Sequence, residues 1–160
     1  KVPGGLAVMR PDTADSLDTV RIPIVKADGT MDFYAAAQFP DRITALVQDA
    51  LVSGFEASGR IDQVSAEQDG LHADYNLLTE IRDFEAKYDV PDGIPTALVT
   101  LSVKLATAHG RRIVASFTSR QAVPAAANTI AAATQAFETA LIAAADAVVG
   151  WALAAQLPKP

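Results

Sequence analysis

The stretch from Thr96 to Arg120 most constrains what this chain can fold into, because the pairing of its two apolar runs can be checked. Every second residue of each run is apolar, the period of a strand with one buried face; these residues are Ala97, Val99, Leu101, Val103, Leu105, and then Ile113, Ala115 and Phe117. Directly opposed residues share a face, so two odd-numbered sets can meet only across a loop of odd length. The sequence therefore predicts a hairpin with the loop Ala108-His109-Gly110, in which Leu105 opposes Ile113, Val103 opposes Ala115 and Leu101 opposes Phe117.

A second hairpin is predicted over residues 18–39. The dipeptide Asp28-Gly29 is a strong signal for a two-residue hairpin loop. A loop of this length places Ile24 opposite Phe33. Pro23 cannot donate a hydrogen bond to a neighbouring strand, so its strand is expected at a sheet edge or with a local irregularity.

Two helices are predicted. The first, at about residues 40–57, begins at Pro40, carries one apolar stripe and stops at Gly59. The second, at about residues 129–155, is rich in alanine and is capped by Asn128 or Thr129. Its short apolar run contains Asp146, which favours a helix that covers a sheet over a transmembrane helix. Its packing stripe consists of Ile130, Phe137, Leu141, Val148 and Trp151.

The segment from Leu71 to Tyr88 fits two periods, because its apolar residues align on one face of a helix and also alternate as in a strand. We interpret it as a strand with a bulge at Asp83-Phe84, since the connector at residues 89–95 would make it a neighbour of the central hairpin. The expected fold class is α+β. Residues 1–160 are expected to form a single domain, in which the two helices pack on a mixed, largely antiparallel sheet.

The composition excludes several classes of function. The net charge of −6 argues against a nucleic-acid partner, because binding to phosphates depends on clustered cations. The chain has no cysteine, and His72 and His109 stand in no metal-ligand or nucleophile motif. The sequence therefore predicts no catalytic residue, no cofactor and no metal site. Four cations gather on the central hairpin, where a solvated strand face is favoured over an anion site: Lys104, Arg111, Arg112 and Arg120.

Two groups of polar residues are candidates for a structural or recognition role. Asp18, Thr19 and Arg21 stand at a strand start, where an internal salt link is expected to serve structure rather than recognition. Asp74 lies between apolar neighbours and is the acid most expected to be buried. A hydrogen bond from a loop or strand-end amide is favoured for it over a role in proton transfer.

The order of motifs along the chain resembles the ABC-type transport auxiliary lipoproteins, the PqiC/YmbA group. Phe39 stands where a tryptophan of that family is expected, and an aromatic residue keeps the packing role there. The lipobox cysteine is absent from this sequence. The motifs are L-A-V at 6–8, L-D-T-V-R-I at 17–22, Y-A at 34–35, L-V-Q-D-A-L at 46–51, A-D-Y-x-L-x-x-x-I-x-x-F-E at 73–85, the hairpin at 96–120 and V-V-G-W at 148–151.

The resemblance implies a fold similar to the N-terminal domain of TolB. It also implies a periplasmic lipoprotein, tethered to a membrane, expected to be the outer one, through an acylated cysteine upstream of Lys1. The implied partners are an MCE-domain protein and the components of an inner-membrane ABC-type transporter of lipids, and homo-oligomerisation is left open. We therefore expect a non-enzymatic subunit that docks to partner proteins.

Two alternatives to docking stay open at this point. A lipid carrier would enclose an acyl chain between the long helix and the sheet, and an apolar cavity with a mouth would distinguish it. A hydrolase would be built on scattered carboxylates, none of which has an apolar frame in the sequence.

Overall fold

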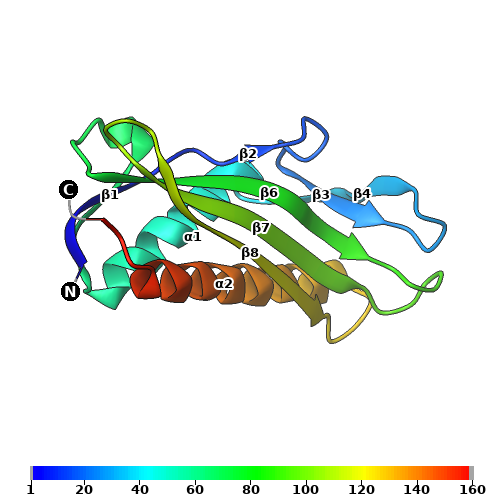
Figure 1. Ribbon diagram of the computed structural model, residues 1–160. Helices are drawn as coiled ribbons and strands as arrows, with labels where there is room; N and C mark the ends of the chain where they lie inside the picture. Colours follow the sequence, from blue (N-terminus) through cyan, green and yellow to red (C-terminus); the bar gives the residue numbers. More distant parts are fainter. Residues whose placement is uncertain (1, 159–160) are drawn as a thin grey trace.

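The computed structural model describes residues 2–158 and consists of one sheet with two α-helices packed on it (Figure 1). The first and last described residues lie near each other at one end of the sheet. The helices are α1 (Ile43–Ser58) and α2 (Ile130–Ala154), and a short 3₁₀ helix, η1 (Glu67–Asp69), lies between them in sequence. The strands are β1 (Val2–Val8), β2 (Asp12–Thr13), β3 (Arg21–Val25), β4 (Met31–Gln38), β5 (Ile61–Ala66), β6 (Tyr75–Lys87), β7 (Thr96–Thr107) and β8 (Ile113–Pro124).

Strand β6 is the centre of the sheet. Along one edge it pairs antiparallel with β7, which in turn pairs antiparallel with β8. Along its other edge β1, β2 and β3 follow one another, each parallel to β6, and β5 and β4 extend the sheet beyond β1 and β3. The mixed sheet and the strand interpretation of this segment are therefore confirmed. The bulge lies between Ile81 and Asp83, one residue before its predicted place.

The β7–β8 hairpin keeps the predicted faces but not the predicted pairs. Its loop has four residues, 108–111, because the backbone hydrogen bond that closes it joins Thr107 N to Arg112 O at 2.9 Å. A bulge beside Leu105 then adds one residue to β8. The longer loop and the bulge together shift the register by two, so odd-numbered residues still share a face. The three predicted pairs are wrong, and Leu105 opposes Ala115, Val103 opposes Phe117 and Leu101 opposes Ser119.

The β3–β4 hairpin has a three-residue loop, 27–29, because a backbone hydrogen bond from residue 26 to residue 30 closes it. Ile24 therefore opposes Asp32, and the prediction that it opposes Phe33 is wrong. A slip of one residue turns every side chain of a strand to the other face, and here it turns Phe33 away from the core. The irregularity predicted at Pro23 is present, since the register shifts between Arg21 and Pro23.

The helix termini follow from local backbone conformation. Helix α1 begins at Ile43 and not at Pro40, because Arg42 is extended, with φ −60° and ψ 146°. It ends as predicted at Gly59, whose left-handed φ of 62° favours glycine. Helix α2 is capped by Thr129, whose Oγ1 accepts a hydrogen bond from Ala132 N at 3.1 Å.

The core lies between the two helices and the sheet. Three buried phenylalanines join the segment before α1, β6 and α2: Phe39 and Phe84 each have their ring centroid 5.3 Å from that of Phe137. Phe39 thus has the packing role expected of an aromatic residue at its position. The helices meet at Gly54, where an added Cβ would lie 3.1 Å from Val149 Cγ2, so the glycine allows their close approach.

Helix α2 is long and apolar enough to cross a membrane by length and composition, with a mean hydropathy of 1.5. In this structure it packs on β7, β8 and α1. Ala140, Ala144 and Val148 are fully buried there. Helix α2 therefore covers the sheet, as the sequence predicts.

Candidate docking surface

The three polar residues at the start of β3 take part in two separate contacts. Asp18 pairs with Arg42, which lies 3.5 Å from its carboxylate and also donates a hydrogen bond to its carbonyl oxygen at 2.7 Å. Arg21 instead lies over the ring of Phe33, 4.1 Å from the centroid, and its backbone N donates to Thr19 Oγ1 at 3.2 Å. These contacts join the segment before β3 to the start of α1, and β3 to β4.

Asp74 fastens the start of β6 to β1 and to the β7–β8 loop. Its Oδ2 accepts a hydrogen bond from Gly5 N at 2.8 Å, and its backbone N and O bond to Gly5 O and Ala108 N, both at 2.9 Å. Gly4 has a φ of 98°, and an added Cβ would lie 2.6 Å from Asp74 Oδ2. Only glycine fits this close approach, and the partner of the carboxylate is a strand-end amide.

The five stripe residues of α2 differ in their surroundings. Phe137 and Val148 are buried, and Leu141 and Trp151 are half-buried. Trp151 stacks on Phe117 of β8, with ring centroids 5.5 Å apart. Ile130 does not join the others, because it is the first residue of α2 and is 40% exposed.

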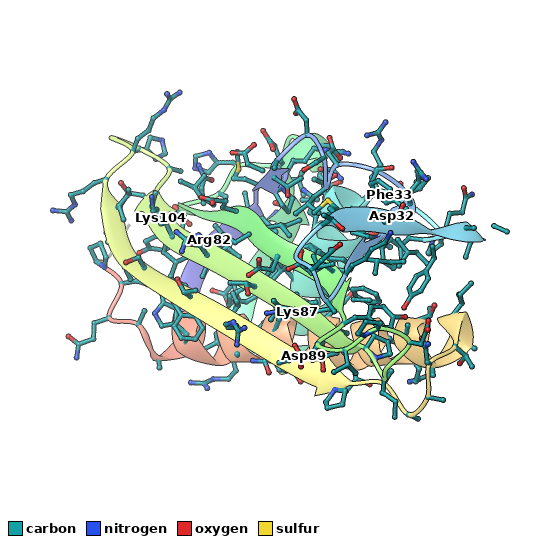
Figure 2. The ribbon with its side chains drawn as sticks, turned by 90° about the vertical axis from the view of Figure 1, so that its right-hand side faces the viewer. Asp32, Phe33, Arg82, Lys87, Asp89 and Lys104 are labelled. Atoms are coloured by element: carbon teal, nitrogen blue, oxygen red, sulfur yellow. The ribbon has the colours of Figure 1, made fainter. Side chains whose placement is uncertain are left out.

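The sheet face that neither described helix covers is polar and carries charges of both signs. Figure 2 shows this face in front of α2, with Arg82, Lys87 and Lys104 on β6 and β7. All three side chains are exposed, and Arg82 pairs with Glu80 at 3.4 Å. Mixed charges that face water support the interpretation of the hairpin cations as a solvated strand face.

An exposed apolar surface lies at the end of the sheet opposite the described chain termini (Figure 1). We call it the loop end; it comprises the connections at residues 26–30, 88–95 and 125–129 with the residues that flank them. Its exposed apolar side chains are Val90 and Ile94, each 59% exposed, Met31 at 45% and Ile130 at 40%. Beside them lies a pocket of about 400 Å³ with apolar walls from Ile24, Ala27, Tyr88 and Pro91 and a charged rim of Lys26, Asp28 and Asp92.

A chain of hydrogen bonds joins two connections of the loop end, 88–95 and 125–129, to β4. Tyr88 donates its hydroxyl proton to Asn128 Oδ1 at 2.7 Å, so Tyr34 donates to the Tyr88 hydroxyl oxygen, also at 2.7 Å. Burial, reinforced by the hydrogen bond to Tyr88, raises the pKa of Tyr34 and keeps its hydroxyl protonated. The chain connects β4, the start of the β6–β7 connection and the residue before the α2 cap.

The turns of the loop end are also well defined. In the β6–β7 connection Gly93 N donates to Val90 O at 3.1 Å, and Asp92 has a φ of 56° after Pro91, the pattern of a type II turn. In the β3–β4 loop the Asp28 carboxylate accepts hydrogen bonds from Thr30 N at 2.9 Å and Thr30 Oγ1 at 2.6 Å, which lower its pKa. The apolar side chains are therefore presented by ordered backbone.

The middle of α2 packs closely on the sheet, since Ala140, Ala144 and Val148 are fully buried. At the end of α2, a pocket of about 10 Å³ lies between Ala152, β1, β6 and β7. Sites for small ligands typically enclose about 300–1,000 Å³. An acyl chain does not fit this space.

The loop end does not follow from the sequence pattern, because the segment D-V-P-D-G-I-P at 89–95 indicates only a connector between two strands. The exposed surface could still have been predicted from Val90 and Ile94, two β-branched apolar residues that flank a turn. Turn segments have no core to fill, so large apolar residues in them point outward unless another element covers them.

Comparison with known proteins defines the family. The model of the ABC-type transport auxiliary lipoprotein component matches residues 2–149. None of the curated proteins compared with the chain matches it. The crystal structure of a Xanthomonas campestris protein of family DUF330 is 33% identical, with a TM-score of 0.88 over 95% of this chain and 85% of that one.

Two more distant structures share the fold alone. PelC from Paraburkholderia phytofirmans, crystallised as a dodecamer, is 16% identical, with a TM-score of 0.55 over 91% of this chain and 85% of that one. The hypothetical protein CT253 from Chlamydia trachomatis is 9% identical, with a TM-score of 0.57 over 94% of this chain and 98% of that one. The match of the family model over nearly the whole chain, together with the Xanthomonas structure, shows that this chain belongs to the ABC-type transport auxiliary lipoprotein components.

Proposed function

We propose that this protein is a non-enzymatic periplasmic subunit of a lipid-transport or envelope-integrity system, and that it acts by docking to partner proteins through its loop end. Membership of a family of auxiliary lipoproteins supports an envelope location and association with an ABC-type transport system. The partners proposed are an MCE-domain protein and the inner-membrane transporter components. The observation that carries the docking role is the set of exposed apolar residues at the ordered connections and the element ends beside them: Val90, Ile94, Met31 and Ile130.

The position of the loop end fits this role. An upstream lipid anchor, proposed for the outer membrane, would reach the domain through β1, whose start lies at the opposite end of the sheet (Figure 1). The loop end would then point away from the anchoring membrane and toward components in the periplasm. Exposed apolar side chains rimmed by charges are a common form of protein interface.

A carrier that encloses lipid is the weaker alternative. It would need a cavity between α2 and the sheet, and the pocket at the end of α2 holds only about 10 Å³. The pocket of about 400 Å³ at the loop end is rimmed by Lys26, Asp28 and Asp92, which suits a protein side chain better than an acyl chain.

Homo-oligomerisation is part of the proposal. The Paraburkholderia neighbour is a dodecamer. An assembly of several copies could present several loop ends to one partner.

The test uses the lipidated full-length protein, expressed with its own leader, and a soluble MCE-domain protein from the same organism as the probe. Binding would be measured by biolayer interferometry for the native sequence and for the double variant V90S/I94S. The matched control is Ile142→Ser, because Ile142 is 53% exposed on α2, away from the loop end.

Docking through the loop end predicts at least a tenfold weaker affinity for V90S/I94S and an unchanged affinity for Ile142→Ser. Equal binding by all three proteins would refute the loop end as the contact. Absence of binding by the native protein, together with recovery of one stoichiometric lipid from it, would favour the carrier.

A further inference from the structure

We propose that His72 and His109 form a binding site for a transition-metal ion such as Zn²⁺ at the end of the sheet opposite the loop end. These are the two histidines of the chain, 37 residues apart in sequence. In the structure their ring centroids are 5.4 Å apart, and the ring planes are inclined at 57°.

The backbone holds the two histidines in place. His72 lies two residues before Asp74, and His109 follows Ala108, whose N donates to Asp74 O at 2.9 Å. Thr107 Oγ1 donates to His109 O at 2.8 Å and accepts from Arg112 N at 3.1 Å, which fixes the hairpin tip. The site is therefore built on two anchored segments and not on free loops.

The distance between the rings suits a shared ion. A Zn–N bond of about 2.1 Å places each ring centroid about 3.2 Å from the ion, and a tetrahedral angle then separates the two centroids by about 5.2 Å. The observed separation is 5.4 Å. Histidine χ2 torsions are broad, so the ring nitrogens can turn toward one ion without a change in the backbone.

The surroundings leave room for an ion and for water. The rings line a groove of about 320 Å³ together with Met9, Glu67 and Asn76. Among the described residues no group of three or more histidines, cysteines or acids could hold a metal. In this proposal the two imidazoles are therefore the only protein ligands, and water would fill the other positions around the ion. Imidazole ligands select Zn²⁺, Ni²⁺ and Cu²⁺ over Mg²⁺ and Ca²⁺.

A bound ion would cross-link the β7–β8 tip to the segment before β6 and so stabilise the folded chain. The experiment titrates ZnCl₂ into tag-free protein by calorimetry and follows both imidazole signals by NMR. The variants are His72→Ala and His109→Ala, and Arg112→Ala is the control at the same tip. Unchanged melting temperatures without metal show that the variants fold.

We expect one Zn²⁺ per chain and joint shifts of both histidine signals. At a metal concentration tenfold above Kd, Tm should rise by about 3–6 °C. Either histidine variant should bind at least tenfold more weakly, while Arg112→Ala should bind like the native chain. Binding that survives in either histidine variant, a shift of only one histidine signal, or equal binding of Mg²⁺ would overturn the proposal.

Discussion

Replacing Phe137 by alanine tests whether the aromatic cluster holds α2 on the sheet. The side chain is 3% exposed, and its ring centroid lies 5.3 Å from those of Phe39 and Phe84. Removal of a buried phenylalanine ring costs about 3–5 kcal/mol. Each aromatic contact contributes about 0.5–1.5 kcal/mol beyond burial, so the loss of two contacts places the expected cost at about 4–5 kcal/mol.

Urea denaturation and calorimetry would measure this change. The free energy of unfolding should fall by the amount given above with an unchanged m-value, and Tm should fall by about 10 °C or more. Phe33→Ala is the matched control, because Phe33 lies away from the core and contacts Arg21; it should cost about 1 kcal/mol. Similar losses for the two variants, or a loss below about 2 kcal/mol for Phe137→Ala, would refute the assignment of this cluster as the joint between helix and sheet.

Two further changes test local features. Thr129→Ala removes the cap of α2 and should lower the free energy of unfolding by about 1 kcal/mol. Thr129→Ser keeps the hydroxyl that caps the helix and should leave the free energy of unfolding nearly unchanged. Equal losses for the two variants would contradict a capping role of this hydroxyl. Burial and the Asp83 carboxylate raise the pKa of Glu85 above its ordinary value of 4.5, although Lys87 opposes the shift. The folded chain then binds more protons than the unfolded chain between the two pKa values, so stability contributed by this group falls as pH rises from 4.5 through the raised pKa. Glu85→Gln should flatten that slope in urea titrations made at several pH values, and a slope that stays the same would show that Glu85 does not cause it.

Periodicity predicted the elements that build the core. The alternation from Leu101 to Leu105 and the stripe through Phe137 and Val148 correspond to buried faces, because burial forces apolar residues into the period of the element. The interpretation of residues 71–88 as a strand depends on the connector that follows, and it is confirmed over Tyr75–Lys87. The period alone fits both a helix and a strand.

The registers could not be predicted from the same pattern. In the β7–β8 hairpin the loop of residues 108–111 is one residue longer than predicted, and the bulge beside Leu105 adds one more residue. The two extra residues together keep the predicted residues on the same face but change which residues oppose each other. In the β3–β4 hairpin Asp28-Gly29 indicated a two-residue loop, but hydrogen bonds from Thr30 to Asp28 stabilise a loop of three. Such local side-chain contacts decide the length of a turn. The alternation of apolar and polar residues along the strands contains no information about them.

The candidate surfaces were harder to predict than the fold. Asp18 was expected in a salt link, but its partner, Arg42, lies 24 residues away and reaches it only because the fold brings the start of α1 beside the segment before β3. The loop end and the histidine pair likewise join segments that are distant in sequence. Tertiary structure brings these segments together. Contacts between segments that are distant in sequence leave no periodic pattern that a single sequence could show.

The size of the loop end bears on how docking would work. The loop end has four large exposed apolar side chains, Met31, Val90, Ile94 and Ile130, which is few for a protein interface. A stable interface between two proteins buries about 1,200–2,000 Å² in total. A single loop end would therefore bind weakly, even though its ordered turns reduce the entropy lost on binding. If several copies bound one partner together, the linked contacts would raise the overall affinity without any new contact in each copy. Weak contacts through single loop ends would therefore make the proposed docking most effective in a homo-oligomer, and an affinity that rises with the number of linked copies would test this.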